Sequence, residues 1–160
     1  MKHLTKALLL VTLVCSLLLC SCNLLTESEK TFTDSGMTIT LTSGFEKNEQ
    51  DGFTVTYASS KIVVFALKED FTNFDADTTL EEYADLVLAA NQLTDTTVTT
   101  ENGLTSFTYE SEVDGVSYSY LATVHEGEDA FWLIQFATKT NDFEANKEAI
   151  ITYAKSITLE

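Results

Sequence analysis

The sequence predicts an α+β fold, an α/β/α sandwich in which two helices cover a largely antiparallel sheet. Three observations predict it. Residues 79–92 and 141–157 carry apolar side chains at the helical period. The segments between them alternate apolar and polar residues and are joined by Asn-Gly and Asp-Gly, which favour tight hairpins. Residues 131–136 are apolar on both faces, which is typical of a strand covered from both sides.

Three strands are expected before the first helix. Residues 37–41 (MTITL) and 53–58 (FTVTYA) alternate apolar and polar side chains, so each should bury one face. Residues 62–68 (IVVFALK) are apolar on both faces, which predicts a central strand. Gly44, residues 48–52 and Ser59-Ser60 supply the turns between them.

The first helix is expected over residues 79–92 (TLEEYADLVLAANQ). Its buried stripe should contain Leu80, Tyr83, Ala84, Val87 and Asn91, flanked by Leu86 and Leu88. Either Thr78 with Glu81 or Thr79 with Glu82 has the spacing of a capping box, which satisfies the unpaired amides of the first turn.

The second half is expected to form an antiparallel meander and a closing helix. Four strands are predicted at 97–101, 104–113, 116–126 and 130–138. The helix over 141–157 should be capped by Asn141 with Glu144, and the aliphatic stem of Lys147 should lie along its apolar stripe. The predicted order is therefore βββ-α-ββββ-α, an α+β arrangement.

The first 21 residues have the pattern of an export signal. Lys2, His3 and Lys6 precede an apolar run from Ala7 to Leu19, which is too short to cross a hydrocarbon core of roughly 30 Å as a stable helix. A transmembrane anchor and an ordinary secretory signal are the alternatives to a cleaved lipoprotein signal.

Leu19-Cys20-Ser21-Cys22 resembles the lipobox of bacterial lipoproteins, because a small residue stands directly before the second cysteine. The resemblance implies that Cys22 becomes the mature N-terminus and carries diacylglycerol, with Cys15 and Cys20 removed. Two acyl chains hold a protein on a bilayer stably, whereas one does so only marginally. The sequence therefore predicts a lipid-anchored protein on the extracytoplasmic face of a bacterial cell membrane, with a polar tether over residues 22–36 and one domain over 37–160.

Charge and cysteine content exclude several function classes. All 25 acidic residues follow the leader, but only seven of the nine lysines do, so the mature chain has a formal charge of −18. Such a surface repels phosphate backbones, so nucleic acid is not expected as a partner. No cysteine follows Cys22, which excludes disulfides, thiolate metal sites and dithiol redox chemistry. No cofactor is expected.

The chain resembles the PsbP-like domain family as found in small bacterial lipoproteins of the DcrB type. The resemblance covers nearly all of residues 37–160 and rests on MTITLTSGFE, TLEEYADLVLAANQ, GLTSFTYESEVDGVSYSYLATVHEGEDAFWLIQFAT and FEANKEAIITYAKSITL. It implies an α/β/α sandwich that serves mainly as a binding or assembly module, such as PsbP in photosystem assembly or relatives that bind a nuclear transport GTPase. It provides no catalytic residues to transfer.

His125 is the one histidine after the leader, so any histidine-based acid–base chemistry must use it. It stands in His125-Glu126-Gly127-Glu128-Asp129 at a predicted hairpin tip, and no nucleophile or metal motif accompanies it. We therefore expect a solvated turn residue. A hydrolase that uses His125 with nearby carboxylates remains the alternative function.

Two further groups are candidate sites. Asp70, Asn73, Asp75 and Asp77 place oxygen ligands at nearly alternate positions, which suits calcium, but the spacing is not that of an EF-hand and a solvated loop is the favoured interpretation. Tyr57, Tyr109, Tyr118 and Tyr120 share strand parity and form either a ligand-binding face or core.

The sequence thus predicts a non-catalytic binding or assembly module whose partner is the membrane through Cys22 and an envelope protein, peptide or glycan. A small-molecule or cation receptor feeding a transporter is the third possibility. The oligomeric state and the identity of the partner are left open by the sequence.

Overall fold

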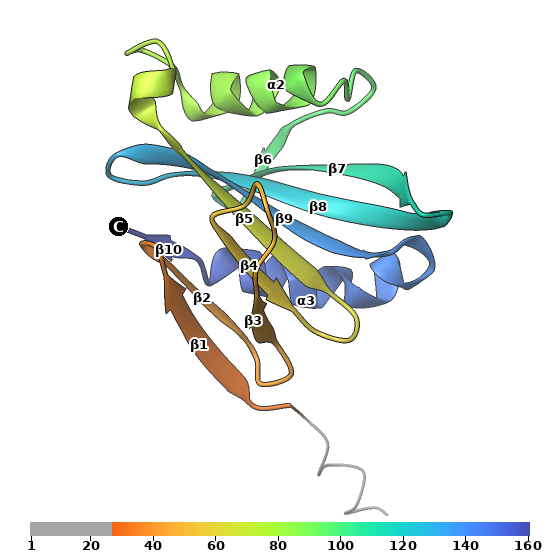
Figure 1. Cartoon of the computed structure of the whole chain (residues 1–160). Helices are drawn as coiled ribbons and strands as arrows, with labels where there is room; N and C mark the ends of the chain where they lie inside the picture. The colour runs from red at the N-terminus through yellow and green to blue at the C-terminus, as the bar shows by residue number, and fades with distance from the viewer. Residues whose placement is uncertain (1–26) are drawn as a thin grey trace, which may run out of the picture.

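A computed structural model describes residues 27–160, which form two antiparallel sheets and two helices (Figure 1). The predicted signal segment, with Cys15 and Cys20, and the predicted lipidation site Cys22 lie outside the described residues. Before the first helix the strands are β1 (Glu29–Asp34), β2 (Met37–Thr42), β3 (Glu46–Asn48), β4 (Val55–Ala58) and β5 (Val63–Asp70). After it come β6 (Thr99–Glu101), β7 (Leu104–Val113), β8 (Val116–Glu126), β9 (Ala130–Lys139) and β10 (Thr158–Leu159).

The main sheet has seven strands in the order β3-β4-β5-β9-β8-β7-β6, and every neighbouring pair is antiparallel. Helix α2 (Leu80–Ala90) covers one face and helix α3 (Phe143–Lys155) lies on the other (Figure 1). The predicted α+β class, with helices on both sides of a largely antiparallel sheet, is confirmed. The predicted central position of the strand around Val63–Lys68 is also confirmed, because β5 pairs on both edges, with β4 and β9.

Alternate residues of β9 build two separate cores. Phe131 and Leu133 pack in the core on the α2 side, together with Tyr83 and Val87 of the helix. The other face of β9 carries Trp132, Ile134 and Phe136. These side chains pack in the core on the α3 side with Ile150 and Ala154 of that helix. Burying each large apolar side chain stabilises the fold by about 1.5–3 kcal/mol, so this strand anchors both layers.

A second sheet, β1-β2-β10, closes the α3-side core. The expectation that residues 22–36 form a polar tether is wrong from Glu29 onward, because Glu29–Asp34 pair residue for residue with β2 as strand β1. Phe32 of this strand packs against Tyr57, with ring centroids 4.8 Å apart. The contact provides a physical reason for the chain to fold here rather than remain a linker.

Helix α2 begins with one of the two expected capping boxes, that of Thr79 with Glu82. The Thr79 amide donates to Glu82 Oε2 at 2.8 Å and the Glu82 amide donates to Thr79 Oγ1 at 3.3 Å. Of the expected stripe, Tyr83, Ala84 and Val87 are buried together with Leu88, whereas Leu86 is half exposed. The cap expected at the second helix is wrong: α3 begins after a 3₁₀ turn, η3 (Thr140–Asp142), and its N-cap Asp142 makes no side-chain capping bond.

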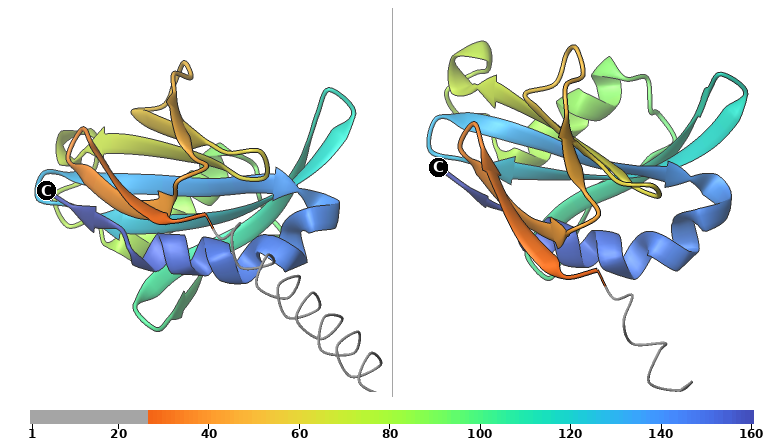
Figure 2. Two further views of the ribbon diagram at one scale, coloured as in Figure 1. Left: turned by 90° about the horizontal axis from the view of Figure 1, so that it is seen from below. Right: turned by 60° about the horizontal axis from the view of Figure 1, so that its bottom comes forward.

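The hairpins of the meander form as expected. Asn102-Gly103 and Asp114-Gly115 both adopt positive φ angles, 52° and 78° in each case, as type I′ turns require. The β7–β8 hairpin extends away from the body of the domain (Figure 2). Within residues 27–160, none of the helices is long and apolar enough to span a membrane.

Candidate functional site

A cleft of about 580 Å³ opens on the α2 side of the main sheet. We call it the aromatic cleft. Four strands and the segments beside them supply its walls, with the end of α2 at one side. Its lining consists of Gln50, Phe53, Phe65, Asn91, Leu93, Tyr109, Glu110, Ser111, Val113, Tyr120 and Gln135.

Two aromatic pairs shape the aromatic cleft. Tyr109 of β7 and Tyr120 of β8 stand directly opposite each other in the antiparallel register, and their rings stack with centroids 4.6 Å apart and planes only 5° from parallel. Phe53 and Phe65 form the second pair, with centroids 4.8 Å apart. All four rings are half-buried. Ring faces of this kind can stack on sugars or on apolar side chains.

A neutral hydrogen-bonding pair lies among these rings. The Tyr109 hydroxyl donates to Gln135 Oε1. The Gln135 amide nitrogen makes no side-chain hydrogen bond within residues 27–160, so it is available to donate to a ligand. Burial, followed by the neighbouring tyrosine, raises the pKa of Tyr109 and of Tyr120 above the usual range. Both hydroxyls therefore stay protonated at physiological pH, and the cleft interior presents no charge.

The structure separates the four tyrosines that the sequence grouped together. Tyr109, Tyr118 and Tyr120 lie on the α2 side of the sheet, because they alternate with the α3-side residues Ser119 and Leu121. Tyr57 is only 2% exposed and lies in the α3-side core. The prediction that all four tyrosines share one face is therefore wrong for Tyr57, whereas Tyr109 and Tyr120 do meet in the aromatic cleft.

The sequence interpretation named only two of the eleven lining residues of the aromatic cleft, and the missed ones include Phe53, Phe65 and Gln135. Phe53 lies in the turn before β4, and Phe65 and Gln135 come from neighbouring strands β5 and β9, where they pair directly. Gln135 was the detectable signal, since it is the one polar residue inside the apolar run 130–137. A polar side chain at such a position usually has a specific bonding role.

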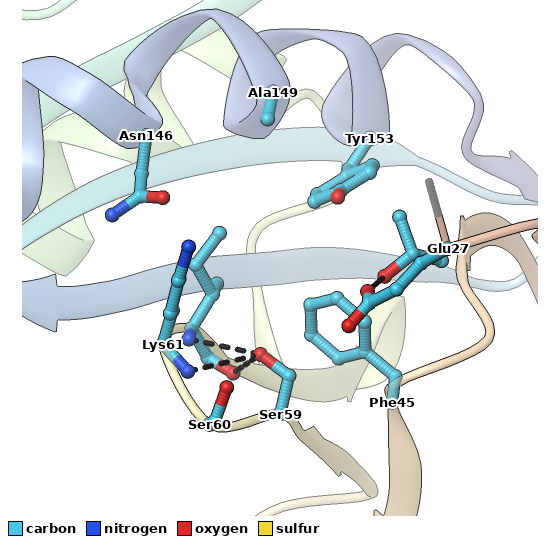
Figure 3. A pocket seen from close by; sticks show the side chains of 10 residues that line it. Glu27, Phe45, Ser59, Ser60, Lys61, Asn146, Ala149 and Tyr153 are labelled. Atoms are coloured by element: carbon cyan, nitrogen blue, oxygen red, sulfur yellow. Dashed lines mark hydrogen bonds between the residues drawn. The ribbon is translucent and has the colours of Figure 1, made fainter. Parts of the chain in front are cut away.

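A second pocket, of about 380 Å³, lies on the α3 side near the beginning of the described chain (Figure 3). Its polar groups already serve local structure. Ser59 Oγ donates to the carbonyl of Ile62 at 3.0 Å and accepts from its amide at 3.0 Å, and Glu27 accepts from Thr42 Oγ1. Phe45 and Tyr153 close the pocket edge-to-face. We therefore take the aromatic cleft as the candidate site.

His125 is not the solvated turn residue that we expected. It belongs to β8, is half-buried opposite Trp132, and its Nε2 lies 2.9 Å from Thr123 Oγ1. Burial lowers its pKa to about 4, so the imidazole is neutral at pH 7. Within the described residues no carboxylate hydrogen-bonds to His125, so the acid partner required by the hydrolase alternative is not at hand.

The candidate calcium ligands do not converge. Asp70 Oδ1 accepts from the Thr72 amide at 2.8 Å and from Thr72 Oγ1 at 2.7 Å, which caps the 3₁₀ turn η2 (Phe71–Asn73). In the part of the chain that the structure describes, no three carboxylate or histidine side chains form a group able to hold a metal ion. Asp75 and Asp77 therefore lie in a loop without forming a cation site with Asp70.

Comparison with solved structures identifies similar folds. The solution structure of cyanobacterial PsbP from Synechocystis sp. PCC 6803 matches with a TM-score of 0.59 and 16% identity over 86% of this chain and 96% of that one. The yeast Ran-binding protein Mog1p, from Saccharomyces cerevisiae, matches with a TM-score of 0.56 and 10% identity over 84% and 96%.

LpqN of Mycobacterium tuberculosis, described as involved in cell envelope biogenesis, matches with a TM-score of 0.50 and 9% identity over 82% and 90%. No protein-family model matches the sequence, and no curated protein matches it. At these identities the similarity shows the fold and nothing finer: the chain has a PsbP-like α+β fold that is structurally similar to PsbP and LpqN.

Proposed function

We propose that this chain is a lipid-anchored binding or assembly module, without catalytic activity, on the extracytoplasmic face of a bacterial cell membrane. Its aromatic cleft holds a segment of an envelope protein, a peptide or a glycan. The observation that carries the proposal is the stacked pair Tyr109–Tyr120 beside the Tyr109–Gln135 hydrogen bond, in a cleft of about 580 Å³.

The chemistry of the aromatic cleft suits neutral or cationic ligands. Its rings offer flat apolar surface, and its tyrosine hydroxyl and glutamine amide offer oriented polar groups, the combination that fixes a ligand's position in most binding sites. The lining contains no lysine, so nothing in it would neutralise an anionic metabolite. Glu110 contributes to the rim, but its carboxylate points to the opposite face of the sheet, where it accepts from Ser119 Oγ.

Anchoring through Cys22 is part of the proposal. The lipobox-like Leu19-Cys20-Ser21-Cys22 and the resemblance to DcrB-type lipoproteins support it. Similar folds occur in a protein described as Ran-binding and in one described as involved in cell envelope biogenesis. These similarities support a role in binding rather than in catalysis.

Both alternatives receive less support. The hydrolase would need His125, whose imidazole bonds to a hydroxyl that cannot act as the carboxylate of a triad. The cation receptor would need the carboxylates of residues 70–77, and Asp70 is committed to capping the 3₁₀ turn η2. A small neutral ligand in the aromatic cleft remains compatible with the geometry.

Cross-linking of the full lipidated protein in its native membrane, followed by mass spectrometry, tests the proposal. The wild type should capture a defined partner at near-stoichiometric yield, and its N-terminal peptide should carry lipid on Cys22. Tyr120→Ala should remove the captured partner because it opens the stacked pair.

Tyr153→Ala is the matched control, since it removes a half-buried tyrosine from the opposite face of the sheet. Capture that survives Tyr120→Ala, or is lost equally in both variants, would contradict a role for the aromatic cleft. An unmodified Cys22 would refute the anchor.

A further inference from the structure

Strand β7 leaves most of one edge unpaired. Its residues 105–113 pair with β8 along one side, whereas on the other side β6 pairs only with Leu104, Thr105 and Ser106. Residues 107–113 therefore have no strand beyond them, and no turn or loop in the described chain makes a backbone hydrogen bond to them. Figure 2 shows this part of the β7–β8 hairpin standing clear of the domain. An edge of this length is a template for another strand.

The register decides which groups point outward. The two-residue turn at Asp114-Gly115 makes Val113 and Val116 the hydrogen-bonded pair that closes the hairpin. Hydrogen bonding alternates along an antiparallel pair, so the amides and carbonyls of Thr108, Glu110 and Glu112 face away from β8. These three residues are exposed.

The side chains along this edge divide by face. Tyr109, Ser111 and Val113 lie on the side of the aromatic cleft and line it, and Val113 is 49% exposed. Glu110 and Glu112 lie on the other face, where Glu110 accepts from Ser119 Oγ at 3.1 Å. A strand added here would place alternate side chains beside the cleft and the others beside the two glutamates.

Charge selects among possible occupants. Residues 69–138, which include the meander except Lys139 at the end of β9, contain 15 acidic side chains and no lysine or arginine. A second copy of β7 is disfavoured, because antiparallel pairing over the whole open edge would place Glu110 opposite Glu110 or Glu112 of that copy. An incoming strand with lysine or arginine at alternate positions would instead meet opposite charges across the pair.

We infer that the open edge of β7 is a strand-addition site for an extended basic segment of a partner protein. Apolar or aromatic residues of that segment lie toward the aromatic cleft, and its lysines or arginines lie beside Glu110 and Glu112. The inference rests on the proposed function, since it names the class of partner that reaches the cleft. Main-chain hydrogen bonds supply affinity in this mode, and the alternating side chains supply specificity.

The test uses the full lipidated chain in bilayer nanodiscs and a synthetic peptide that alternates lysine with valine and tyrosine. The peptide should slow amide exchange of Thr108, Glu110 and Glu112, and added salt should weaken its binding. A peptide with glutamate in place of lysine should bind at least about tenfold more weakly, a difference of roughly 1.4 kcal/mol.

Glu110→Pro removes the outward amide but keeps the bonds to β8, because proline is tolerated where an edge amide faces solvent. It should reduce affinity for the lysine peptide at least about tenfold. Glu110→Gln is the matched control: it loses the same charge and keeps the amide, so its affinity should fall by less. Glu112→Pro gives a second edge variant, and fluorescence of the one tryptophan, Trp132, checks that each variant is folded.

Several results would overturn the inference: no binding of the lysine peptide, equal affinities of folded Glu110→Pro and Glu110→Gln, equal binding of the glutamate peptide, or protection confined to β1, the outer strand of the other sheet. None of these would by itself remove the proposed function. If partner capture in the native membrane still depends on Tyr120, the aromatic cleft binds a partner, and only the inferred strand addition at β7 is wrong.

Discussion

At the scale of single residues, neutral polar groups held against aromatic rings give the aromatic cleft its chemistry. The Tyr109–Gln135 hydrogen bond fixes both side chains, and the stacked Tyr120 keeps the phenol ring of Tyr109 in place. Burial raises the pKa of both tyrosines, so neither ionises in the physiological range. The site should therefore bind a neutral ligand with little dependence on pH.

His125 should instead make the stability of the fold depend on pH. Its folded-state pKa of about 4 lies below the ordinary value of 6.5 because the ring is buried. The unfolded chain therefore binds a proton between these values and the folded chain does not, so stability is complete above about pH 6.5 and falls as pH decreases toward 4. The loss from this group amounts to about 3 kcal/mol.

Denaturant unfolding followed by Trp132 fluorescence at several pH values measures this effect. His125→Gln, which keeps a hydrogen-bonding side chain beside Thr123, should be less pH-dependent than the wild type between pH 6.5 and 4. Comparing the two chains cancels the contribution of the many carboxylates. Parallel stability curves for the two would show that His125 is not the titrating group.

Single residues also mark the limit of sequence interpretation. Alternation correctly placed Tyr109 and Tyr120 on one face, because they lie on adjacent strands joined by a two-residue turn that fixes their register. Tyr57 was placed wrongly because its strand reaches the meander only through β5 and β9. The parity between distant strands depends on pairing that no local pattern specifies.

At the scale of elements, the first helix owes its start to the capping box of Thr79 and Glu82. Hydrogen bonds from the Thr79 amide and hydroxyl lower the pKa of Glu82, so this contribution is present above the carboxyl's ordinary pKa and is lost as pH falls. The helix also forms one wall of the α2-side core, which places Asn91 and Leu93 at the aromatic cleft.

Thr79→Ala should destabilise the domain by about 1 kcal/mol, because it leaves the Glu82 amide without its acceptor. Thermal unfolding of the full chain measures the change. Thr78→Ala is the control, because this threonine belongs to the other candidate box and does not cap α2. Equal destabilisation by the two substitutions would contradict the assignment of the cap.

Strands and helices with strong hydrophobic periodicity could be predicted from the sequence. Short strands that form only by pairing with a neighbouring strand could not. β7 and β8 begin and end at the residues that the turn dipeptides indicated. β3 is exposed at all three positions, and β10 has only two residues that pair with β2. Neither carries a pattern of its own, so each is specified by the strand that it joins.

At the scale of the whole molecule, the proposed anchor at Cys22 would constrain how the domain lies relative to the membrane. β1 begins at Glu29. If Cys22 carries lipid, residues 23–28 can span at most about 20 Å at full extension. The pocket containing Glu27 and Lys61 then lies near the bilayer, while α2 lies on the far side of the sheet (Figures 1 and 3).

Quenching by spin-labelled lipids checks this orientation. A fluorophore on Lys61→Cys should be quenched strongly, and one on the exposed Asp85→Cys of α2 should be quenched weakly. Residues 23–160 contain no other cysteine, so each label has a single position. Equal quenching at the two sites would mean that the domain does not hold this orientation.

The lysines are unevenly distributed along the chain. Six of the seven lysines after residue 21 lie outside residues 62–138, and Lys68 is the exception. If the chain is anchored through Cys22, repulsion between the acidic meander and anionic lipid would favour an orientation that turns the meander away from the bilayer.

Photo-cross-linking from defined positions in the native membrane tests the central claim most directly, that the aromatic cleft is the binding surface. A photoreactive residue at Val113, on the rim of the cleft, should form a defined cross-link that disappears when Tyr120→Ala is added. The same residue at the exposed Thr152 of α3 should form none. A defined product from Thr152 alone, or a Val113 product that is unaffected by Tyr120→Ala, would contradict the claim.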